Sequence, residues 1–288
     1  MKVIETHIVP AIDESIRLQE YGVSIFEGIP TRSSLKKAIK KGLILIDGVT
    51  ATTAQWIQKG QKIELLQETA TFKIFKLPLK VLYEDEELAV IVKPAGVATS
   101  GNYFKTIRSA LPFNLQASKA TDALPAPEPA HRLDKETSGL LLIAKTRKTL
   151  LQLHQHFTKK HIQKTYFAII HGEFESHQSI RKPIAGKAAE TIIEPLETYE
   201  VESKTYSLVK LLPITGRTHQ LRIHLSEAGK PIVADDIYGQ KEGFFSNRSL
   251  FLFSGKIEFQ HPGTGKKMIF EEKLPKKFRF LKRHLRTP

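Results

Sequence analysis

The residues best suited to do chemistry form one short segment in the middle of the chain, HRLDKETSG at 131–139. Within it, Asp134 lies between the cationic side chains of Arg132 and Lys135. A carboxylate that is flanked by cations and held at the edge of a buried strand stays ionised, as a nucleophilic carboxylate must be. The residues alone leave open a second interpretation, an aspartate that caps a turn through its own backbone.

The elements around this segment are predicted from hydrophobic periodicity. Ser138-Gly139 predicts a tight turn, and the apolar run at 140–144 that follows is typical of a buried strand. A second apolar run at 88–92 predicts another strand, which ends at Lys93-Pro94-Ala95-Gly96. The connection at 99–130 contains three prolines between positions 125 and 129, so we expect an extended covering loop.

After the segment, the sequence predicts alternating helices and strands. Amphipathic periodicity favours helices at 147–159 and 220–226, and apolar runs favour strands at 166–170 and 207–212. Two late strands at 250–253 and 256–259 are expected to pair around Ser254-Gly255. The three histidines at 154, 156 and 161 do not share one helical face, so no metal site is predicted from them.

Composition limits the possible partners and locations. The chain has 288 residues, 41% of them hydrophobic, and no cysteine, which excludes disulfides and thiolate metal sites. No apolar run approaches the roughly 18 residues of a membrane-spanning helix, and the N-terminus lacks the pattern of a signal peptide. We therefore expect a cytoplasmic protein that has no membrane partner.

The charge is strongly basic and unevenly distributed. The net charge is +14, and residues 131–288 carry 28 Lys and Arg against 16 Asp and Glu. This excess around the candidate catalytic segment points to a polyanionic partner. The alternative is a basic surface that serves only solubility.

A separate small unit is predicted at 11–70. Pro30–Ser34 is a helix-start signal, Leu35, Ala38 and Ile39 recur at helical spacing, and Gly42 ends the helix. A strand at 43–46 and the hairpin signal Asp47-Gly48 follow. The exposed side of this helix is basic, and its candidate RNA-binding residues are Arg32, Lys36, Lys37, Lys40 and Lys41.

Three ordered blocks resemble the RluA-like pseudouridine synthases, which convert uridine within an RNA chain to pseudouridine. The blocks are HRLDKETSGLLLIAKT at 131–146, Lys164-Thr165-Tyr166, and GRTHQLRIH at 216–224, trailed by Asp236-Ile237-Tyr238-Gly239. The match runs from about Leu79 to the C-terminus. It implies an α+β catalytic domain at 81–288 with a mixed, mostly antiparallel sheet and a central cleft, joined to the N-terminal unit by a linker at 71–80.

The resemblance also implies roles for individual residues. Asp134 is the catalytic carboxylate, Arg222 pairs with it, and Tyr166 stacks on the uracil and serves as a base. Arg132 enters the RNA stack that the flipped base has left, and Leu221 forms the apolar floor of the pocket. The remaining expected substrate-binding residues are His131, Arg217, His219 and Lys93.

The N-terminal unit resembles, in its helix and hairpin, the small RNA-binding domain first seen in ribosomal protein S4. Its first helix departs from that pattern, because Arg17-Leu18-Gln19 stands where Arg-Leu-Asp is usual. A cap domain without RNA contact is the alternative. The basic C-terminal residues 271–288, with seven Lys and Arg against two Glu, are predicted to touch the RNA backbone.

The sequence therefore predicts an RNA pseudouridine synthase that acts on ribosomal or transfer RNA. We expect it to need no nicotinamide or flavin cofactor, because the reaction involves no redox change, and the sequence has no Gly-rich phosphate loop. We also expect no metal and no obligatory protein partner. Two alternatives remain open: a non-catalytic RNA-binding protein of the same fold, and a nucleic-acid glycosylase that releases the base.

Overall fold

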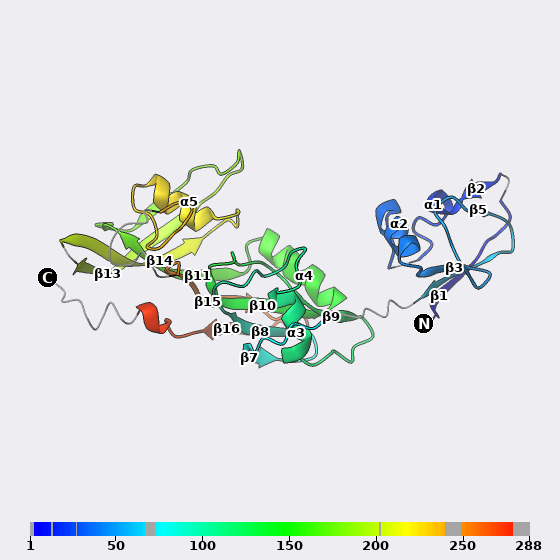
Figure 1. Ribbon diagram of the computed structural model, residues 1–288, viewed down its shortest axis with the longest axis horizontal. Helices are drawn as coiled ribbons and strands as arrows, with labels where there is room; N and C mark the ends of the chain where they lie inside the picture. Colours follow the sequence, from blue (N-terminus) through cyan, green and yellow to red (C-terminus); the bar gives the residue numbers. More distant parts are fainter. Residues whose placement is uncertain are drawn as a thin grey trace. The chain divides into compact units, whose positions relative to one another are not determined.

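A computed structural model describes residues 3–12, 14–26, 28–66, 73–201, 203–239 and 249–278. The chain divides into two compact units, residues 1–71 and 72–288, which Figure 1 shows and which are described separately below. Most of the basic tail predicted to touch RNA, from 279 onward, lies outside the described residues. In the described part of the chain, no helix is long and apolar enough to cross a membrane.

The N-terminal unit is a small α/β structure. Its elements are β1 (Val3–Ile8), β2 (Ile16–Arg17), α1 (Leu18–Tyr21), α2 (Arg32–Lys40), β3 (Ile44–Ile46), β4 (Val49–Thr50), β5 (Trp56–Ile57) and β6 (Lys62–Leu66). Four strands form an antiparallel sheet in the order β1-β6-β3-β4, and β2 pairs with β5. The first helix is a single turn, in keeping with its weak sequence signature.

Helix α2 forms where the sequence predicted it. Thr31 caps the helix, because its hydroxyl accepts a hydrogen bond from the Ser34 backbone N–H at 3.2 Å. Leu35, Ala38 and Ile39 are buried in the core of this unit, so the lysines of the helix are left on its solvent side. The hairpin turn follows at Asp47-Gly48, where both residues have positive φ angles.

The larger unit, residues 72–288, is an α+β structure built on one ten-stranded sheet. Its strands are β7 (Lys80–Glu84), β8 (Leu88–Lys93), β9 (Ala123–Pro129), β10 (Ser138–Thr146), β11 (Gln163–His171), β12 (Gln178–Ile180), β13 (Thr191–Val201), β14 (Lys204–Pro213), β15 (Leu252–Gln260) and β16 (Lys267–Glu271). Its helices are α3 (Ile107–Asn114), α4 (Arg147–Thr158) and α5 (Gln220–Glu227).

The main path of the sheet runs β12-β13-β14-β11-β15-β10-β8-β7, with β16 beside β15 and β9 beside β10. Among the described strand pairs of this sheet, β10–β15 is parallel and the others are antiparallel. The predicted mixed, mostly antiparallel sheet is therefore confirmed.

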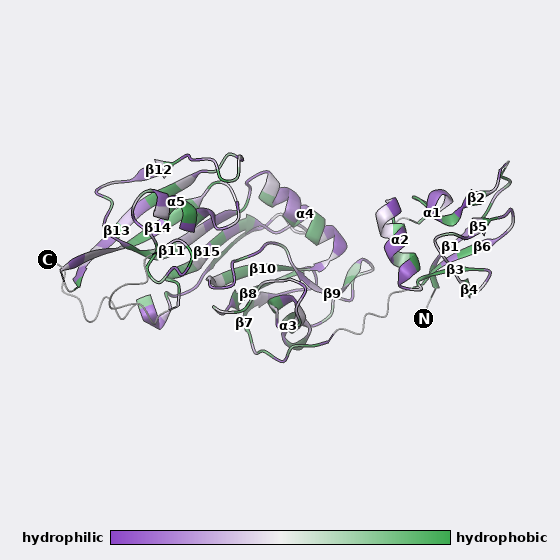
Figure 2. Cartoon of the chain, turned by 45° about the horizontal axis from the view of Figure 1, so that its top comes forward, coloured by the Kyte–Doolittle hydropathy of each residue, from purple (hydrophilic) through white to green (hydrophobic). Residues whose placement is uncertain are grey.

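The run at 140–144 is buried on both faces, which explains why it has no polar alternation. Leu141 and Ile143 face the cluster that includes α3, whereas Leu140, Leu142 and Ala144 face the cluster that includes Leu153 of α4. The two helices thus cover opposite faces of the sheet at β8 and β10 (Figure 1). In Figure 2, α4 carries both hydrophobic and hydrophilic residues, as a helix with one face on a sheet must.

Two sequence predictions about secondary structure outside the 131–139 segment are wrong. The connection at 99–130 is not a continuous extended loop, because residues 107–114 form α3 in spite of Pro112. This helix starts at a Thr106 cap and buries Ile107, Ala110 and Leu111, and this packing outweighs the hydrogen bond that the proline removes. Residues 250–259 do not form two paired strands, since β15 is one strand with an irregular register opposite Thr165 and Tyr166.

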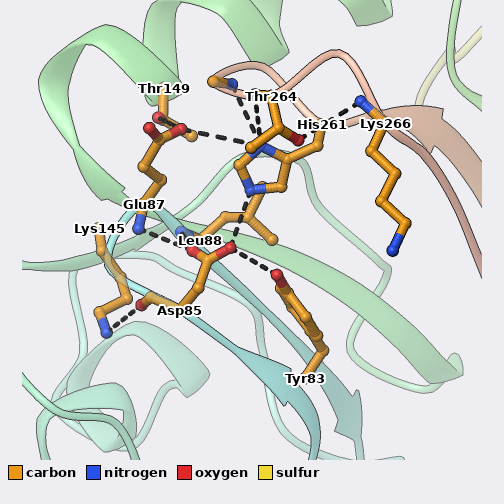
Figure 3. Close-up of polar contacts among 10 residues, drawn as sticks. Tyr83, Asp85, Glu87, Leu88, Lys145, Thr149, His261, Thr264 and Lys266 are labelled. Atoms are coloured by element: carbon orange, nitrogen blue, oxygen red, sulfur yellow. Dashed lines mark hydrogen bonds and ion pairs between the residues drawn. The ribbon is translucent and has the colours of Figure 1, made fainter.

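A polar network ties the β7–β8 hairpin to the turn between β15 and β16 (Figure 3). The Asp85 carboxylate accepts hydrogen bonds from the Tyr83 hydroxyl at 2.6 Å and from His261 Nε2 at 2.8 Å. His261 Nδ1 in turn accepts from the backbone N–H groups of Gly263 and Thr264, so the ring proton lies on Nε2. The hydrogen bond from the Tyr83 hydroxyl to Asp85 raises the pKa of Tyr83 to about 12, and burial adds to this effect.

Candidate active site

A cavity of about 920 Å³ opens beside the 131–139 segment. Its walls come from this segment, from the start of β11, from the end of β14 and from the loop that leads into α5. Most of the predicted site residues line it: His131, Arg132, Asp134, Tyr166, Arg217, His219, Leu221 and Arg222. Residues that are far apart in the sequence thus meet in one place, as the three ordered blocks predicted.

The backbone around Asp134 is held by hydrogen bonds from the segment that follows β8. The Thr99 hydroxyl accepts from the Leu133 N–H at 3.1 Å and donates to the Leu133 carbonyl at 2.8 Å. The Thr137 N–H donates to the Asp134 carbonyl at 3.1 Å and closes a turn. Asp134 is therefore presented by a rigid loop, and Thr99 is a positioning residue that the sequence analysis missed.

Lys93 has a different place from the one predicted. It is fully buried, and its ammonium donates to the backbone carbonyls of Pro94, Lys135 and Thr137 at 2.7–3.0 Å. All three donors are used inside the protein, so Lys93 supports the loop instead of contacting the substrate. Burial lowers the pKa of Lys93 to about 8, although the nearby carboxylates of Glu136 and Asp134 act in the opposite direction.

Gly139 has a structural reason to be glycine. Its φ angle is +120°, and a Cβ atom at this position would lie 2.2 Å from the backbone oxygen of Ser254 on β15. Ser138 and Gly139 begin strand β10 and pair with Phe253 and Ser254. The predicted tight turn at Ser138-Gly139 is therefore wrong, and the turn lies immediately before it, at 134–137.

Arg222 does not form the predicted ion pair with Asp134. Its Nε and Nη2 atoms donate to the two carboxylate oxygens of Asp235 at 2.7 and 2.6 Å, and both side chains are almost fully buried. Asp235 also accepts the backbone N–H groups of residues 237 and 238. Burial alone would lower the pKa of Arg222, but Asp235 and, more weakly, Asp134 raise it. Asp134 therefore lies within electrostatic range of Arg222 without direct contact.

Among the ion pairs of the described residues, the one that involves Asp134 is with His219. Its Nε2 lies 3.7 Å from Asp134 Oδ1, and its Nδ1 shares a 3.0 Å hydrogen bond with the Tyr238 hydroxyl. His219 has a left-handed backbone conformation, with φ of +53°, directly before α5. Tyr238 also lies under the Arg222 guanidinium, 5.2 Å from ring centre to Cζ. Asp235 and Tyr238 thus complete the site. The sequence signal that could have identified them is DDIYG at 235–239.

Tyr166 and Leu221 form the apolar part of the site and are 8% and 6% exposed. Burial raises the pKa of the Tyr166 phenol, and the charge of Asp134 adds to this, while a hydrogen bond with Ser254 opposes it. The phenol is therefore protonated at neutral pH and is able to donate a hydrogen bond.

His131 has a structural contact in addition to its place in the cavity wall. Its Nε2 accepts the Leu142 backbone N–H at 3.1 Å, which ties the start of the segment to β10. Burial, together with the charge of Lys164, lowers the pKa of His131 to about 3. The imidazole is therefore neutral at physiological pH.

The rim of the cavity is cationic. Arg132, Lys160 and Arg217 are exposed, and Lys164 lies deeper in the wall. Arg217 is oriented by the Ala188 carbonyl, which accepts its Nε–H at 3.0 Å. In the described part of the chain, Asp134 is the sole carboxylate that lines this cavity.

The basic residues of the N-terminal unit also gather at one place. Arg32, Lys36, Lys37 and Lys40 line a hollow of about 380 Å³ on the solvent side of α2, together with Ser33. Lys41 follows the helix as its C-cap residue and does not line this hollow. Arg32 also forms an exposed ion pair with Glu20 at 3.2 Å.

Comparison with known proteins gives the relationships of the chain. Residues 87–227 match the sequence model of the RNA pseudouridylate synthase family. The chain is 32% identical to the ribosomal large subunit pseudouridine synthase C of Escherichia coli K12, over 90% of this chain and 88% of that protein. It is also 32% identical to the protein of the same name from Pasteurella multocida, over 86% of this chain and 84% of that protein.

A solved structure supports the same relationship. The human RNA pseudouridylate synthase domain containing 4 protein superposes with a TM-score of 0.59 and is 25% identical, over 73% of this chain and 94% of that one. The RluA-like resemblance read from the three sequence blocks is thereby confirmed. This chain belongs to the RNA pseudouridylate synthase family.

Proposed function

We propose that this RNA pseudouridine synthase modifies uridine in large-subunit ribosomal RNA, with Asp134 as its catalytic carboxylate. The names of the two bacterial relatives support the choice of RNA. The observation that carries the role of Asp134 is its position as the sole carboxylate among the described residues of the cavity wall. A cytoplasmic location follows from this choice of substrate.

The reaction is an isomerisation, and its atoms balance within the substrate. The bond between N1 of uracil and C1′ of ribose breaks, the base turns, and C5 bonds to C1′. C5 loses a proton and N1 gains one, so the composition is unchanged. A carboxylate serves either by attacking C1′ or by removing a proton from C2′ to give a glycal. Asp134 fits both routes, because each requires one ionised carboxylate beside the ribose.

Arg222 supports Asp134 through its charge and not through a direct contact. The paired hydrogen bonds to Asp235 fix the guanidinium, so that its charge stays near Asp134 at no entropic cost during the reaction. His219 Nε2, 3.7 Å from the carboxylate oxygen, helps to orient Asp134.

The protonated phenol of Tyr166 stacks on the flipped base above Leu221 and donates a hydrogen bond to it. Its raised pKa keeps the proton on the phenol at neutral pH, so Tyr166 must give up this proton before it is able to accept the C5 proton as a base.

The remaining residues hold the RNA. Arg132 is exposed at the rim, where its planar guanidinium is able to take the place of the flipped base in the stack. Arg217 contacts the backbone near the target, and neutral His131 packs at the edge of the pocket.

Residues 11–70 form an S4-like RNA-binding domain, 71–80 a connecting segment and 81–288 the catalytic domain. The lysines of α2, with Arg32, contact RNA phosphates. Their position around one hollow on the solvent side supports this assignment.

A glycosylase is the less favoured function, for a geometric reason. Most glycoside hydrolases use two carboxylates, one of which activates the attacking water. In the described cavity wall Asp134 has no carboxylate partner of this kind, since buried Asp235 is held by Arg222. The missing water-activating base favours rejoining of the base over its release.

The test is product analysis on ribosomal RNA that lacks the modification. We expect pseudouridine, which has the mass of uridine, and loss of the C5 hydrogen from RNA labelled there with tritium. Free uracil and abasic RNA would instead identify a glycosylase. Bound but unchanged RNA would identify a non-catalytic binding protein.

A further inference from the structure

Lys164 lies in the wall of the cavity without any assigned role. It is on β11, two residues before Tyr166, so both side chains project from the same face of the strand. Lys164 and Tyr166 both line the cavity, and Lys164 is partly buried. Its ammonium is therefore close to the position that the flipped nucleotide would occupy.

The charge of Lys164 has no anionic partner in the described part of the chain. No hydrogen bond or ion pair of its ammonium is present there; its Nζ lies 5.7 Å from the ring centroid of Phe157, and its charge acts on neutral His131. Burial lowers the pKa of Lys164, and no carboxylate acts against this effect. A partly desolvated ammonium without an anion is an unfavourable arrangement unless a ligand supplies one.

Other buried lysines show what a satisfied ammonium looks like in this fold. Lys93 donates to three backbone carbonyls, and Lys145 forms an ion pair with Glu84 at 2.8 Å and donates to the Asp85 carbonyl. Both are sealed inside the protein. Lys164 differs in that its polar end faces the cavity and not a protein acceptor. The missing partner is therefore expected to enter the cavity with the substrate.

We propose that the ammonium of Lys164 binds a phosphate that flanks the target uridine. This inference rests on the proposed function, because it takes RNA as the substrate. A flipped nucleotide brings its two flanking phosphates towards the cavity, and one of them would then approach the carboxylate of Asp134. Lys164 offsets the repulsion between these two anions and fixes the ribose relative to Asp134. It is a substrate-binding residue and takes no part in bond breaking.

The test combines a change in the protein with a change in the RNA. Lys164→Met keeps an apolar stem against Phe157 but removes the charge. A single methylphosphonate removes the charge from one linkage of a short RNA, and it is placed in turn on the 5′ side of the target, on its 3′ side and at a distant position. Single-turnover rates and dissociation constants are measured for all combinations, which form double-mutant cycles.

We expect Lys164→Met to lower kcat/KM by about 10- to 100-fold on unmodified RNA, as for loss of a charge-assisted hydrogen bond. The wild type should lose a similar factor with the neutral linkage on one side of the target. On RNA with this neutral linkage, Lys164→Met should be little slower than the wild type. Lys164→Arg should restore part of the rate. Lys159→Met, a change of the same type outside the cavity, should show no coupling to any linkage.

The contrary result is that Lys164→Met and a methylphosphonate lower the rate independently, so that their two factors multiply at both flanking linkages. Lys164 would then not contact a phosphate, and this result would overturn the proposal. Thermal unfolding separates out a purely structural role, because removing an unpaired charge should leave the melting temperature unchanged or raise it. If wild-type protein makes no pseudouridine at all, the proposed function fails instead, and the coupling is still measurable in the dissociation constants.

Discussion

The carboxylate of Asp235 holds the guanidinium of Arg222 by two hydrogen bonds, of 2.6 and 2.7 Å, in a nearly water-free position. This pair orients the cation that stands near Asp134, so the positive charge of the site depends on a residue outside the cavity wall.

Asp235→Asn should therefore weaken both the fold and the reaction. It leaves the buried charge of Arg222 without a counter-charge, and such a change costs about 3–5 kcal/mol of unfolding free energy. Denaturant unfolding measures the first effect and pseudouridine formation the second. Asp236→Asn is the matched control, because the neighbouring Asp236 is exposed and should tolerate the change. Equal stability of both variants would contradict the central place given to the Arg222–Asp235 pair.

Asp134→Asn should keep the fold and the affinity for RNA but lose isomerisation, because an amide is neither a nucleophile nor a base of the required kind. Tritium release from RNA labelled at C5 measures the rate, and a filter-binding titration measures the affinity. Glu136→Gln, two residues away and outside the cavity lining, is the control and should stay active. A rate for Asp134→Asn within about tenfold of wild type would mean that another group is the catalyst.

Lys93 gives a prediction about pH. Its pKa is about 8 in the folded protein, below the ordinary value of 10.5, so the unfolded chain binds more protons between these two values. Stability attributable to Lys93 should consequently rise as the pH increases from about 8 to 10.5, by up to about 3 kcal/mol. The measurement is the difference in unfolding free energy between wild type and Lys93→Met across this range. A difference that stays flat with pH would show that the ammonium has an ordinary pKa.

The basic face of α2 should contribute to RNA affinity and not to chemistry. Replacing Lys36, Lys37 and Lys40 by Gln should weaken binding to long RNA and leave the single-turnover rate at saturation unchanged. Each lost phosphate contact should flatten the slope of log affinity against log salt by about 0.7–0.9. The control replaces the exposed residues Lys204, Lys266 and Lys267 in the same way. Identical slopes for both triple variants would leave α2 with a structural role only.

Local patterns predicted the parts of the fold that depend on local physics. The apolar run at 140–144 is a buried strand and the Thr31 cap begins α2, because strand burial and helix capping are settled within a few residues. The position of Asp134 in a cavity with Tyr166 and Leu221 followed from the ordered motifs.

Local sequence patterns could not predict the ion-pair partner of Arg222. Two carboxylates, Asp134 and Asp235, were both chemically suitable, and only the tertiary structure decides between them. Lys93 illustrates the same limit, since a lysine beside a proline and a glycine resembles a surface loop residue until its carbonyl partners are known. Helix α3 was missed because the gain from burying Ile107 and Leu111 depends on a sheet that the local sequence does not contain.

The parallel pairing of Gly139 with Ser254 also has a consequence for the order of synthesis. Strand β15 is synthesised long after β10, and the Asp85–His261 hydrogen bond forms only after His261, which follows β15, has been synthesised (Figure 3). A nascent chain that stops before β15 lacks the strand that lies between β10 and β11, the two strands that carry the Asp134 loop and Tyr166. Contacts of such long sequence separation form late in folding. The last strand of the N-terminal unit, β6, ends at Leu66, so this unit is able to fold on the ribosome well before the cavity exists, and activity is withheld until β15 has been made.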